Sequence, residues 1–389
     1  YKEKVVDMSD VAIVAAGATR FDEKIPRRAE ELVAEALLEA FDGVKGLSLN
    51  EIDTLVTSYF IDARQVAEEW IIQDYIGHIP RAAFRVENGG GSGASAFYTA
   101  YSLIKGGLSD VVLVAGWEKM SLYRTLMANE LIARGLDVDF DFDVGAIYTA
   151  CYAMMAVRRM HVYGEREEDF ARIAVKNRNN ALKNPKGQWK RRITVEDVLE
   201  SRLIAYPLKV LDCSLISDGA AVLILSSVER AKEITDDPVI VEGIGIGTDT
   251  MRLGDRAEIT NFPACRVAAR RAYRMAGIDD PVRDLDCAEI YDSFDTVELQ
   301  TYEDLGFVKK GKGVEFIEET EIGGRLPVNM SGGLEGMGHP IGASPIAEIA
   351  EIFWQLRGES CNQVDGAERG LVHSHGGAGT AVVVSVLGR

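Results

Sequence analysis

The two halves of the chain present the same order of sequence signals, and this repetition constrains the fold more than any other feature. A predicted strand at Val11–Ala15 opens the first half, and another at Pro238–Gly243 opens the second. Each half later contains a Gly-rich turn that leads into a helical pattern, at Asn88–Ser95 and at Gly336–Ala343. Self-similarity of this kind indicates a duplicated structural unit. We therefore predict two related α/β units that pack against each other.

The predicted strands are short and apolar, and they do not alternate between apolar and polar residues. Strands of this kind belong in sheets that helices cover on both faces. They are expected at Val11–Ala15, Val111–Ala115, Ala221–Leu225, Val239–Val241 and Ala381–Val386, with helices at Ala29–Phe41, Ala94–Ile104 and Val267–Met275. We assign residues 8–237 to the first half and 238–389 to the second. Residues 118–207 fall outside the repeat and are expected to form an inserted domain of helices and loops.

Charge and composition exclude several classes of function. The 389 residues include 61 acidic and 43 basic side chains, a net charge of −18, so nucleic acid is a poor partner and an anionic ligand needs a local basic pocket. The five cysteines form no CxxC pair, which favours a reducing cytoplasm over disulfides or a zinc site. No apolar run reaches the ~18 residues of a membrane span, and Tyr1–Asp10 lacks the apolar stretch of a signal peptide. We therefore expect a cytoplasmic protein without a bound metal.

The two Gly-rich turns are candidates for a functional site, because free N–H groups at a helix N-terminus can stabilise a developing oxyanion. Tight packing alone also explains such turns. The first turn lacks the spacing of a dinucleotide-binding or P-loop motif. The second contains His339 between Gly338 and Pro340. A histidine in this setting is either a structural residue or a group that donates to a substrate carbonyl or moves a proton, and we favour the second.

Linked motifs over nearly the whole chain resemble the thiolase superfamily, above all its archaeal-type and sterol-carrier-protein-x-type members. They are Val11–Phe21, Ala115–Met120, Tyr206–Ala221, Glu289–Phe294, Gly323–Gly333, Gly338–Ala343 and His373–Gly379. The resemblance implies a five-layered α-β-α-β-α fold with a loop domain that covers the site. It also implies at least a homodimer and coenzyme A thioester substrates, with coenzyme A as substrate or product and no permanently bound cofactor.

The chain departs from the family pattern at positions that carry chemistry. Gly90 stands where the nucleophilic cysteine of the family is expected. Tyr291 replaces an asparagine or histidine of the family, and Ser293 replaces a cysteine. His373 aligns with the second catalytic cysteine, while His339 keeps its family position. The resemblance therefore implies a site that is built from His339, Tyr291, His373 and Gly90.

The glycine has a direct chemical consequence. It has no side-chain nucleophile, so an acyl-enzyme cannot form at Gly90. The backbone amides of the turn remain available as an oxyanion hole. We also expect the missing side chain to leave room for a bulkier substrate or for the thiol of a second coenzyme A. The cysteines, including Cys151 and Cys213, are expected to be packing residues rather than substitute nucleophiles.

Coenzyme A needs positive charge on this acidic protein, and a basic segment lies in the predicted covering domain. The resemblance places the nucleotide end of coenzyme A against that domain. The residues expected to contact it are Lys183, Lys186, Lys190, Arg191 and Arg192 at the phosphates and Trp189 at the adenine. A solvated basic loop without a ligand is the alternative. Ser214 aligns with a serine that contacts the pantetheine arm in thiolases.

The leading hypothesis is an enzyme that makes or breaks a carbon–carbon bond beside a coenzyme A thioester without a cysteine acyl-enzyme. In its main form, free coenzyme A attacks a bulky 3-oxoacyl-CoA directly, in a retro-Claisen thiolysis, with His339 at the thioester oxygen and Tyr291 at the keto group. The alternative is retro-aldol cleavage of a 3-hydroxyacyl-CoA with Tyr291 as base, as in thiolase-like aldolases of steroid side-chain degradation. Those aldolases share the tyrosine but lack the histidine.

Two further expectations concern partners and the loss of activity. A non-catalytic coenzyme-A-binding or scaffold subunit is a third possibility, which the absent cysteine favours and the retained His339 opposes. By family analogy we also expect a small OB-fold protein with a zinc ribbon as a partner.

Overall fold

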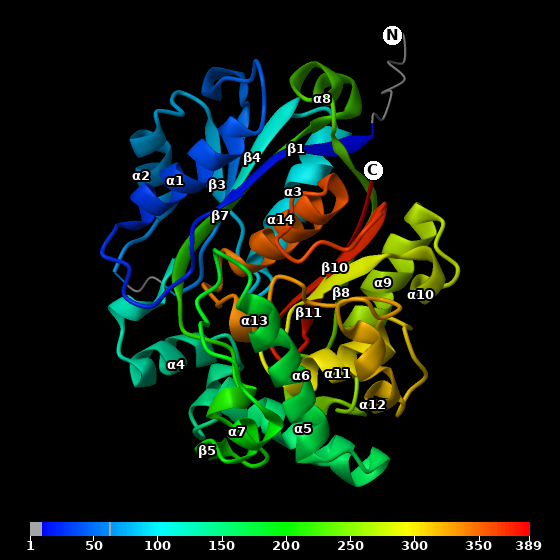
Figure 1. Ribbon diagram of the computed structural model, residues 1–389. Helices are drawn as coiled ribbons and strands as arrows, with labels where there is room; N and C mark the ends of the chain where they lie inside the picture. Colours follow the sequence, from blue (N-terminus) through cyan, green and yellow to red (C-terminus); the bar gives the residue numbers. More distant parts are fainter. Residues whose placement is uncertain (1–9, 62–63) are drawn as a thin grey trace.

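A computed structural model describes residues 10–61 and 64–389 of the chain (Figure 1). The segment Tyr1–Asp10, in which we expected no signal peptide, lies outside the described residues apart from Asp10. The expected start of the first half at residue 8 also lies outside them.

The first half of the chain supplies five strands of one mixed sheet. They are β1 (Val11–Ala18), β2 (Thr54–Ser58), β3 (Ala82–Arg85), β4 (Val111–Lys119) and β7 (Asp218–Ser227). Their order is β3-β2-β4-β7-β1, in which β2 runs parallel to β3 and β4, and β7 runs antiparallel to β4 and β1. Every residue of β1 and β2 is buried, and the uninterrupted apolar sequence of β1 predicts this.

The second half repeats this arrangement. Its strands are β8 (Val239–Thr248), β9 (Cys287–Ile290), β10 (Arg369–Gly376) and β11 (Ala381–Gly388). Strand β9 is parallel to β10, and β11 is antiparallel to β10 and β8, which matches β2, β4, β7 and β1 of the first half. Strands β1 and β8 pair briefly, so the two parts form one nine-stranded sheet. The predicted duplication is confirmed at the level of topology.

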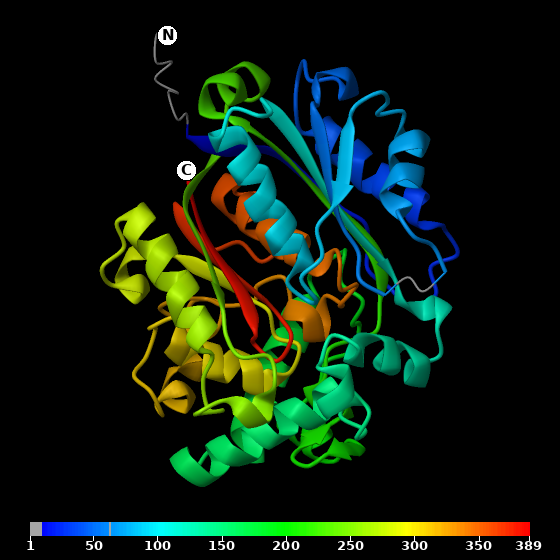
Figure 2. The ribbon, with the colours of Figure 1, turned by 180° about the vertical axis from the view of Figure 1, so that it is seen from behind.

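Helices form three layers around the two parts of the sheet (Figures 1 and 2). The outer layer on the first half contains α1 (Ala29–Asp42), α2 (Glu68–Ile76) and α8 (Val228–Ile234). The central layer contains α3 (Ser92–Lys105) and α14 (Ser344–Arg357), which pack against each other and against strands of both halves. The outer layer on the second half contains α9 (Pro263–Ala276), α10 (Pro281–Asp284), α11 (Asp295–Asp304) and α12 (Gly313–Phe316). The predicted five-layered α-β-α-β-α fold is confirmed.

Glycines allow α9 to lie directly on β8. A Cβ atom at Gly243, Gly245 or Gly247 would stand 2.1–2.4 Å from a carbonyl oxygen of α9, so no larger residue fits without moving the helix. The facing residues of α9 are the small Ala264, Ala268 and Ala272. This pattern of small residues explains the close contact between helix and strand in the second half.

The segment between β4 and β7 forms a separate group of elements at one end of the molecule (Figure 1). It contains α4 (Thr125–Ala133), α5 (Tyr148–Tyr163), α6 (Glu167–Ala181), α7 (Val195–Leu199), β5 (Leu203–Ala205) and β6 (Leu208–Lys209). We call it the covering domain. Helix α6 packs against α11 and against the short helix α13 (Gly333–Gly336) of the second half. Among the described residues, no helix has the length and apolar character that crossing a bilayer requires.

Candidate active site

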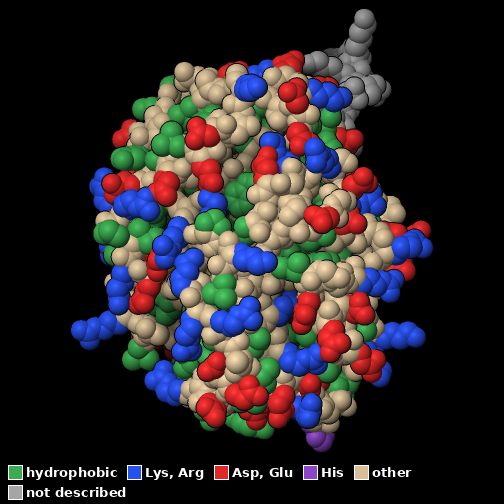
Figure 3. Space-filling view, in the orientation of Figure 1, with side chains coloured by type: hydrophobic (Ala, Val, Ile, Leu, Met, Phe, Trp, Pro, Cys, Tyr) green, Lys and Arg blue, Asp and Glu red, His purple; other side chains and the backbone are tan. Residues whose placement is uncertain are grey.

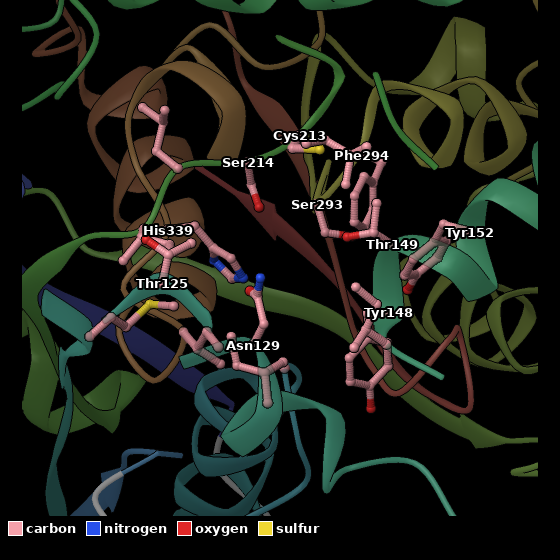
Figure 4. Close-up of a pocket in the computed structure, with 18 of the residues that line it drawn as sticks. Thr125, Asn129, Tyr148, Thr149, Tyr152, Cys213, Ser214, Ser293, Phe294 and His339 are labelled. Atoms are coloured by element: carbon pink, nitrogen blue, oxygen red, sulfur yellow. The ribbon is translucent and has the colours of Figure 1, made fainter. Parts of the chain in front are cut away.

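A cavity of about 320 Å³ lies between the covering domain and the two halves of the fold (Figure 4). All three parts contribute side chains to its wall. Those used below are Gly90, Asn129, Tyr148, Tyr152, Arg202, Cys213, Ser214, Tyr291, Ser293, His339 and His375. The cavity wall is mostly apolar, with a few polar groups that point inward, as is usual for sites that bind small molecules.

Tyr291 fills the space that a side chain at Gly90 would need. Gly90 lies in the turn before α3, and Tyr291 follows the end of β9. A Cβ atom built on Gly90 would stand 2.4 Å from the Tyr291 hydroxyl oxygen and 2.8 Å from the carbonyl oxygen of His375. Our expectation that the glycine opens room for a bulkier substrate or a second thiol is therefore wrong. The phenol occupies that room instead.

Tyr291 begins a chain of hydrogen bonds through His339. The Tyr291 hydroxyl lies 3.1 Å from His339 Nε2, and His339 Nδ1 lies 2.9 Å from the Ser344 hydroxyl. Ser344 donates to the carbonyl oxygen of Pro340 at 3.0 Å. Because the Ser344 hydroxyl uses its proton in that bond, it accepts from His339 Nδ1. His339 therefore carries its proton on Nδ1, and its Nε2 accepts from the Tyr291 hydroxyl. We assign this tautomer because every donor in the chain then has an acceptor.

Burial keeps both members of this pair uncharged. Loss of hydration lowers the pKa of His339 to about 3, so its imidazole is neutral near pH 7. Burial also raises the pKa of Tyr291 well above its ordinary value of 10, and the Glu348 carboxyl raises it further. Tyr291 is therefore a protonated phenol that donates to a neutral imidazole.

The backbone of His339 is held from the covering domain. Its N–H donates to the Ser217 hydroxyl at 2.8 Å, and Ser217 in turn donates to Gln188 Oε1 at 2.5 Å. Next to these groups, Gly338 has a φ of +118°, and a Cβ atom there would lie 2.8 Å from Ser217 Oγ. The glycine before His339 is thus required both by backbone conformation and by this close contact.

The buried carboxylate of Glu118 ties the His339 turn to the first half of the fold. It accepts hydrogen bonds from the backbone N–H groups of Phe60, Ile61 and Gly342 at 2.9–3.1 Å. Phe60 lines the cavity, and so does Ile341, the residue before Gly342. Burial raises the pKa of Glu118 from 4.5 to about 7, although the three N–H groups favour its charged form.

His375 takes the place in the cavity wall that we expected for His373. His373 is fully buried and is absent from the wall of the cavity, whereas His375 lines it. The two rings lie 5.6 Å apart between centroids. Both residues point to the same face of β10, but His375 is nearer to the strand end at Gly376, where the cavity opens. His375 Nε2 lies 2.7 Å from the Tyr152 hydroxyl.

Of the residues expected to bind coenzyme A, Ser214 lines the cavity. The others lie outside its wall. Lys186 is bonded to Glu39 at 2.7 Å, and the ring of Trp189 lies 4.3 Å from the Arg178 guanidinium. Lys183, Lys190, Arg191 and Arg192 are exposed. Lys and Arg side chains are spread over the middle of the face that Figure 3 shows.

Several residues of the cavity wall escaped the sequence analysis. Asn129 comes from α4, and Tyr148 and Tyr152 come from α5. Arg202 precedes β5, is exposed, and has no acidic partner among the described residues. All four belong to the covering domain, which lies outside the repeat and carries no motif that marks single residues. The helical repeat of the sequence does not by itself identify which polar side chains of the covering domain face the cavity.

The cysteines near the cavity are poor nucleophiles. Cys213 lines the wall and is half-buried, and burial raises its pKa far above the ordinary value of 9. Burial raises the pKa of Cys151 to about 11, and Cys151 does not line the cavity. All five cysteines are free thiols. Within the described ranges, no three or more His, Cys, Asp or Glu side chains gather as metal ligands.

Family models match almost the whole chain. The model of the thiolase N-terminal domain matches residues 11–229, and the thiolase C-terminal domain-like model matches residues 245–389. An acetyl-CoA acetyltransferase of Methanothermobacter thermautotrophicus is 38% identical over 98% of this chain and 100% of its own length. A 17-hydroxy-3-oxo-4-pregnene-20-carboxyl-CoA lyase of Mycobacterium tuberculosis is 33% identical over 97% of this chain and 98% of its own length.

A solved structure is similar along the full chain as well. The Ltp2-ChsH2 (DUF35) aldolase has a TM-score of 0.86 and 31% sequence identity, and the match covers 98% of each chain. These relatives are transferases, lyases and aldolases, which speaks against a non-catalytic subunit. The duplicated five-layered fold, the cavity under the covering domain and these matches lead to one conclusion: the chain is an enzyme of the thiolase superfamily that acts on a carbon–carbon bond of an acyl-CoA.

Proposed function

We propose that the protein is a retro-aldolase that cleaves a 3-hydroxyacyl-CoA into a carbonyl compound and a shorter acyl-CoA. One observation carries the proposal: the hydroxyl of Tyr291 occupies the place next to the turn of Gly90 where a nucleophilic side chain would stand. A phenol in this place suits proton transfer at the hydroxyl on carbon 3 of a thioester. The order of our two sequence-based hypotheses is therefore reversed, and thiolysis becomes the second candidate.

The proposed reaction begins with a proton transfer through the tyrosine. The substrate hydroxyl gives its proton to Tyr291 while Tyr291 gives its own proton to His339 Nε2, 3.1 Å away. As the C3–O bond becomes a carbonyl, the bond between C2 and C3 breaks, and its electrons form the thioester enolate. His339 is then an imidazolium beside the enolate, and their opposite charges stabilise each other in the water-poor cavity. The same proton returns to C2 and gives the acyl-CoA product.

The low pKa of His339 suits this cycle. An imidazole whose burial lowers its pKa to about 3 accepts a proton only while the enolate provides a nearby negative charge. It releases the proton to C2, where the electron pair of the enolate forms the new C–H bond. Ser344 holds Nδ1 at 2.9 Å and so keeps Nε2 directed at the phenol.

The experiment that tests the proposal uses purified protein with acyl-CoA substrates that carry a tertiary hydroxyl on carbon 3. We expect the ketone and the shorter acyl-CoA to form without added coenzyme A. Replacement of Tyr291 with Phe removes the relay and is expected to lower kcat at least about 100-fold, the usual size of an acid–base contribution. The proposal fails if the Tyr291→Phe variant cleaves these substrates at the rate of the unchanged protein.

Thiolysis of a bulky 3-oxoacyl-CoA is the second candidate, and the likeness to an acetyl-CoA acetyltransferase favours it. Coenzyme A would attack directly, because Gly90 offers no nucleophile. The same preparation is therefore assayed with 3-oxoacyl-CoA and free coenzyme A. Consumption of the free thiol would support thiolysis, since the aldol reaction consumes none.

For coenzyme A itself, we propose that the pantetheine arm passes Ser214 and that the phosphates lie near Arg202 and the basic segment. This segment contains the ion-paired Lys186 and the exposed Lys190, Arg191 and Arg192. Arg202 lines the cavity and has no acidic partner among the described residues. Replacement of Arg202 with Ala is expected to raise KM for acyl-CoA about 5- to 50-fold, since a charge-assisted hydrogen bond contributes about 1.5–3 kcal/mol. An unchanged KM would remove Arg202 from the binding site.

We also propose that two copies of the chain assemble as a homodimer along β3. This strand is at the end of the sheet order and pairs with β2 alone among the described strands. Nearby apolar side chains are exposed, among them Trp70 at 63% and Phe84 at 37%. Open strand edges with apolar neighbours favour association. Sedimentation of the unchanged protein and of a Trp70→Lys variant tests this: the variant should sediment as a monomer.

A small OB-fold protein with a zinc ribbon remains the proposed second partner. The support is the similar solved structure, an aldolase whose name includes ChsH2 (DUF35). Co-purification of the full chain from its native host is the test. We expect a small zinc-containing protein at a fixed ratio, and a chain recovered without one would contradict the proposal.

A further inference from the structure

In its resting form, the Tyr291–His339 pair has no free hydrogen-bond donor for the thioester oxygen of a substrate. Cleavage places negative charge on the thioester oxygen, which requires N–H or O–H groups in a cavity with little water. His339 Nδ1 already donates to Ser344, and Nε2 faces the Tyr291 hydroxyl. A side-chain donor beside the imidazole would therefore add to the backbone N–H groups of the Gly90 turn in stabilising the charge on the thioester oxygen.

The amide of Asn129 is available for this role. Asn129 comes from α4 of the covering domain and lines the cavity. Figure 4 shows its side chain extending into the cavity toward the imidazole of His339. Among the described residues the amide has no hydrogen-bond partner, although it is half-buried. A polar group in this setting is expected to find its partner in a ligand.

Three other polar side chains of the cavity are less suited. The Tyr152 hydroxyl is already engaged with His375 and with the carbonyl of Gly377. Ser293 and Thr149 lie on the opposite side of the cavity from His339 (Figure 4). An asparagine amide offers two N–H donors on a side chain that is short and keeps no charge of its own.

We infer that Asn129 is a catalytic residue whose Nδ2–H donates to the thioester oxygen of the substrate and stabilises the enolate that forms there. The inference rests on the proposed retro-aldol function and adds to it a residue from the covering domain. It also gives that domain a chemical role besides enclosing the cavity.

The first test compares two replacements with a neighbouring control. Asn129→Leu has a similar branched shape without a donor, and Asn129→Asp has the same shape but presents negative oxygen atoms. Both are expected to lower kcat about 10²–10³-fold, as the loss of an oxyanion donor does in other enzymes. The exposed Glu130→Gln on the same helix controls for changes in α4 and should keep the unchanged rate. Full activity of Asn129→Leu would overturn the inference.

The second test does not depend on turnover. Acetyl-CoA with ¹³C at the carbonyl is bound to the protein, and the C=O stretching band is measured by infrared difference spectroscopy. A donated hydrogen bond lowers this frequency in the unchanged protein and in Glu130→Gln. The band is expected to return toward its solution value in Asn129→Leu and Asn129→Asp. An identical band in all variants would overturn the inference.

The two measurements separate the inference from the function on which it rests. If no 3-hydroxyacyl-CoA is cleaved but the band still depends on Asn129, the retro-aldol proposal fails while the contact stands. If cleavage occurs and the band is independent of Asn129, the contact fails while the reaction stands.

Discussion

At the scale of single residues, the site depends on a pair that fits only together. The hydroxyl of Tyr291 lies where the Cβ of any larger residue at position 90 would stand. Each residue therefore determines what its partner can be. The sequence revealed both departures from the family pattern, but not that one fills the space of the other, because contact between residues 200 positions apart is a property of the fold.

This pair predicts a coupled effect on stability. We expect Gly90→Ala to reduce the free energy of unfolding by about 1–3 kcal/mol, the usual cost of overpacking. Tyr291→Phe removes the nearest clashing atom, so the double variant should recover part of that loss. The carbonyl of His375, 2.8 Å away, prevents full recovery. Denaturant unfolding of the unchanged protein, the two single variants and the double variant measures the coupling. Strictly additive changes in unfolding free energy would contradict the predicted contact.

Glu118 predicts a dependence of stability on pH. Burial raises its pKa from 4.5 to about 7, so the folded state favours the protonated form. Its contribution is complete below pH 4.5 and is lost as the pH rises through 7, by at most about 3 kcal/mol. Replacement with Gln removes the titration. The loss of unfolding free energy between pH 5 and 7.5 should therefore be smaller in Glu118→Gln than in the unchanged protein, and equal losses would contradict the assignment.

At the scale of elements, the basic segment holds the turn of His339. The backbone N–H groups of Gln188 and Trp189 donate to the carbonyls of Met337 and Gly336 at 2.9 and 3.0 Å. The Gln188 side chain adds the bond to Ser217, which in turn accepts from the His339 N–H. A segment that we expected to contact coenzyme A thus also positions the turn that carries the histidine.

This arrangement predicts opposite kinetic effects within one segment. Gln188→Ala is expected to lower kcat about 2- to 10-fold with little change in KM, since one positioning hydrogen bond of about 0.5–1.5 kcal/mol is lost. The Lys190 side chain donates to the carbonyl oxygen of Asn184 rather than to the turn, so Lys190→Ala should change KM rather than kcat. Gln188→Glu keeps the acceptor for Ser217 and should recover part of the rate. A change in KM alone for Gln188→Ala would reject the positioning role.

The elements of the two halves could be predicted largely from their sequences. The apolar runs located the cores of β1, β4, β7, β8 and β11, and most boundaries lie a few residues outside the predicted ones. The histidines of β10 show the limit of such prediction. The alternation of side chains along a strand predicts on which face of the sheet a residue lies, but not how far along the strand the cavity begins. We therefore expected His373 in the cavity wall, where His375 lies.

At the scale of the whole molecule, a buried ion cluster joins the covering domain to the second half. Arg159 of α5 bonds Glu165 at 2.5 Å and Glu303 of α11 at 2.7 Å, and all three side chains are at most 3% exposed. The covering domain brings Asn129, Tyr148 and Tyr152 to the cavity. Their positions therefore depend on how this cluster holds the domain. No local pattern in the sequence predicts such a long-range arrangement.

The cluster predicts a large stability effect of one substitution. Arg159→Met leaves two carboxylates buried without their partner and is expected to cost about 3–5 kcal/mol. Removing the charges as well, in Arg159→Met with Glu165→Gln and Glu303→Gln, should restore part of that loss. Denaturant unfolding is the measurement. A single variant as stable as the unchanged protein would show that the cluster does not hold the domain.

The mutual exclusion between Gly90 and Tyr291 also limits how this lineage can have arisen. A cysteine at position 90 and a tyrosine at position 291 would need the same space on this backbone, so a path of single substitutions loses the cysteine before it gains the tyrosine. The intermediate on such a path has neither the thiol of the first chemistry nor the phenol of the second. The reverse path also passes through an intermediate with neither group, so single substitutions do not easily restore the first chemistry.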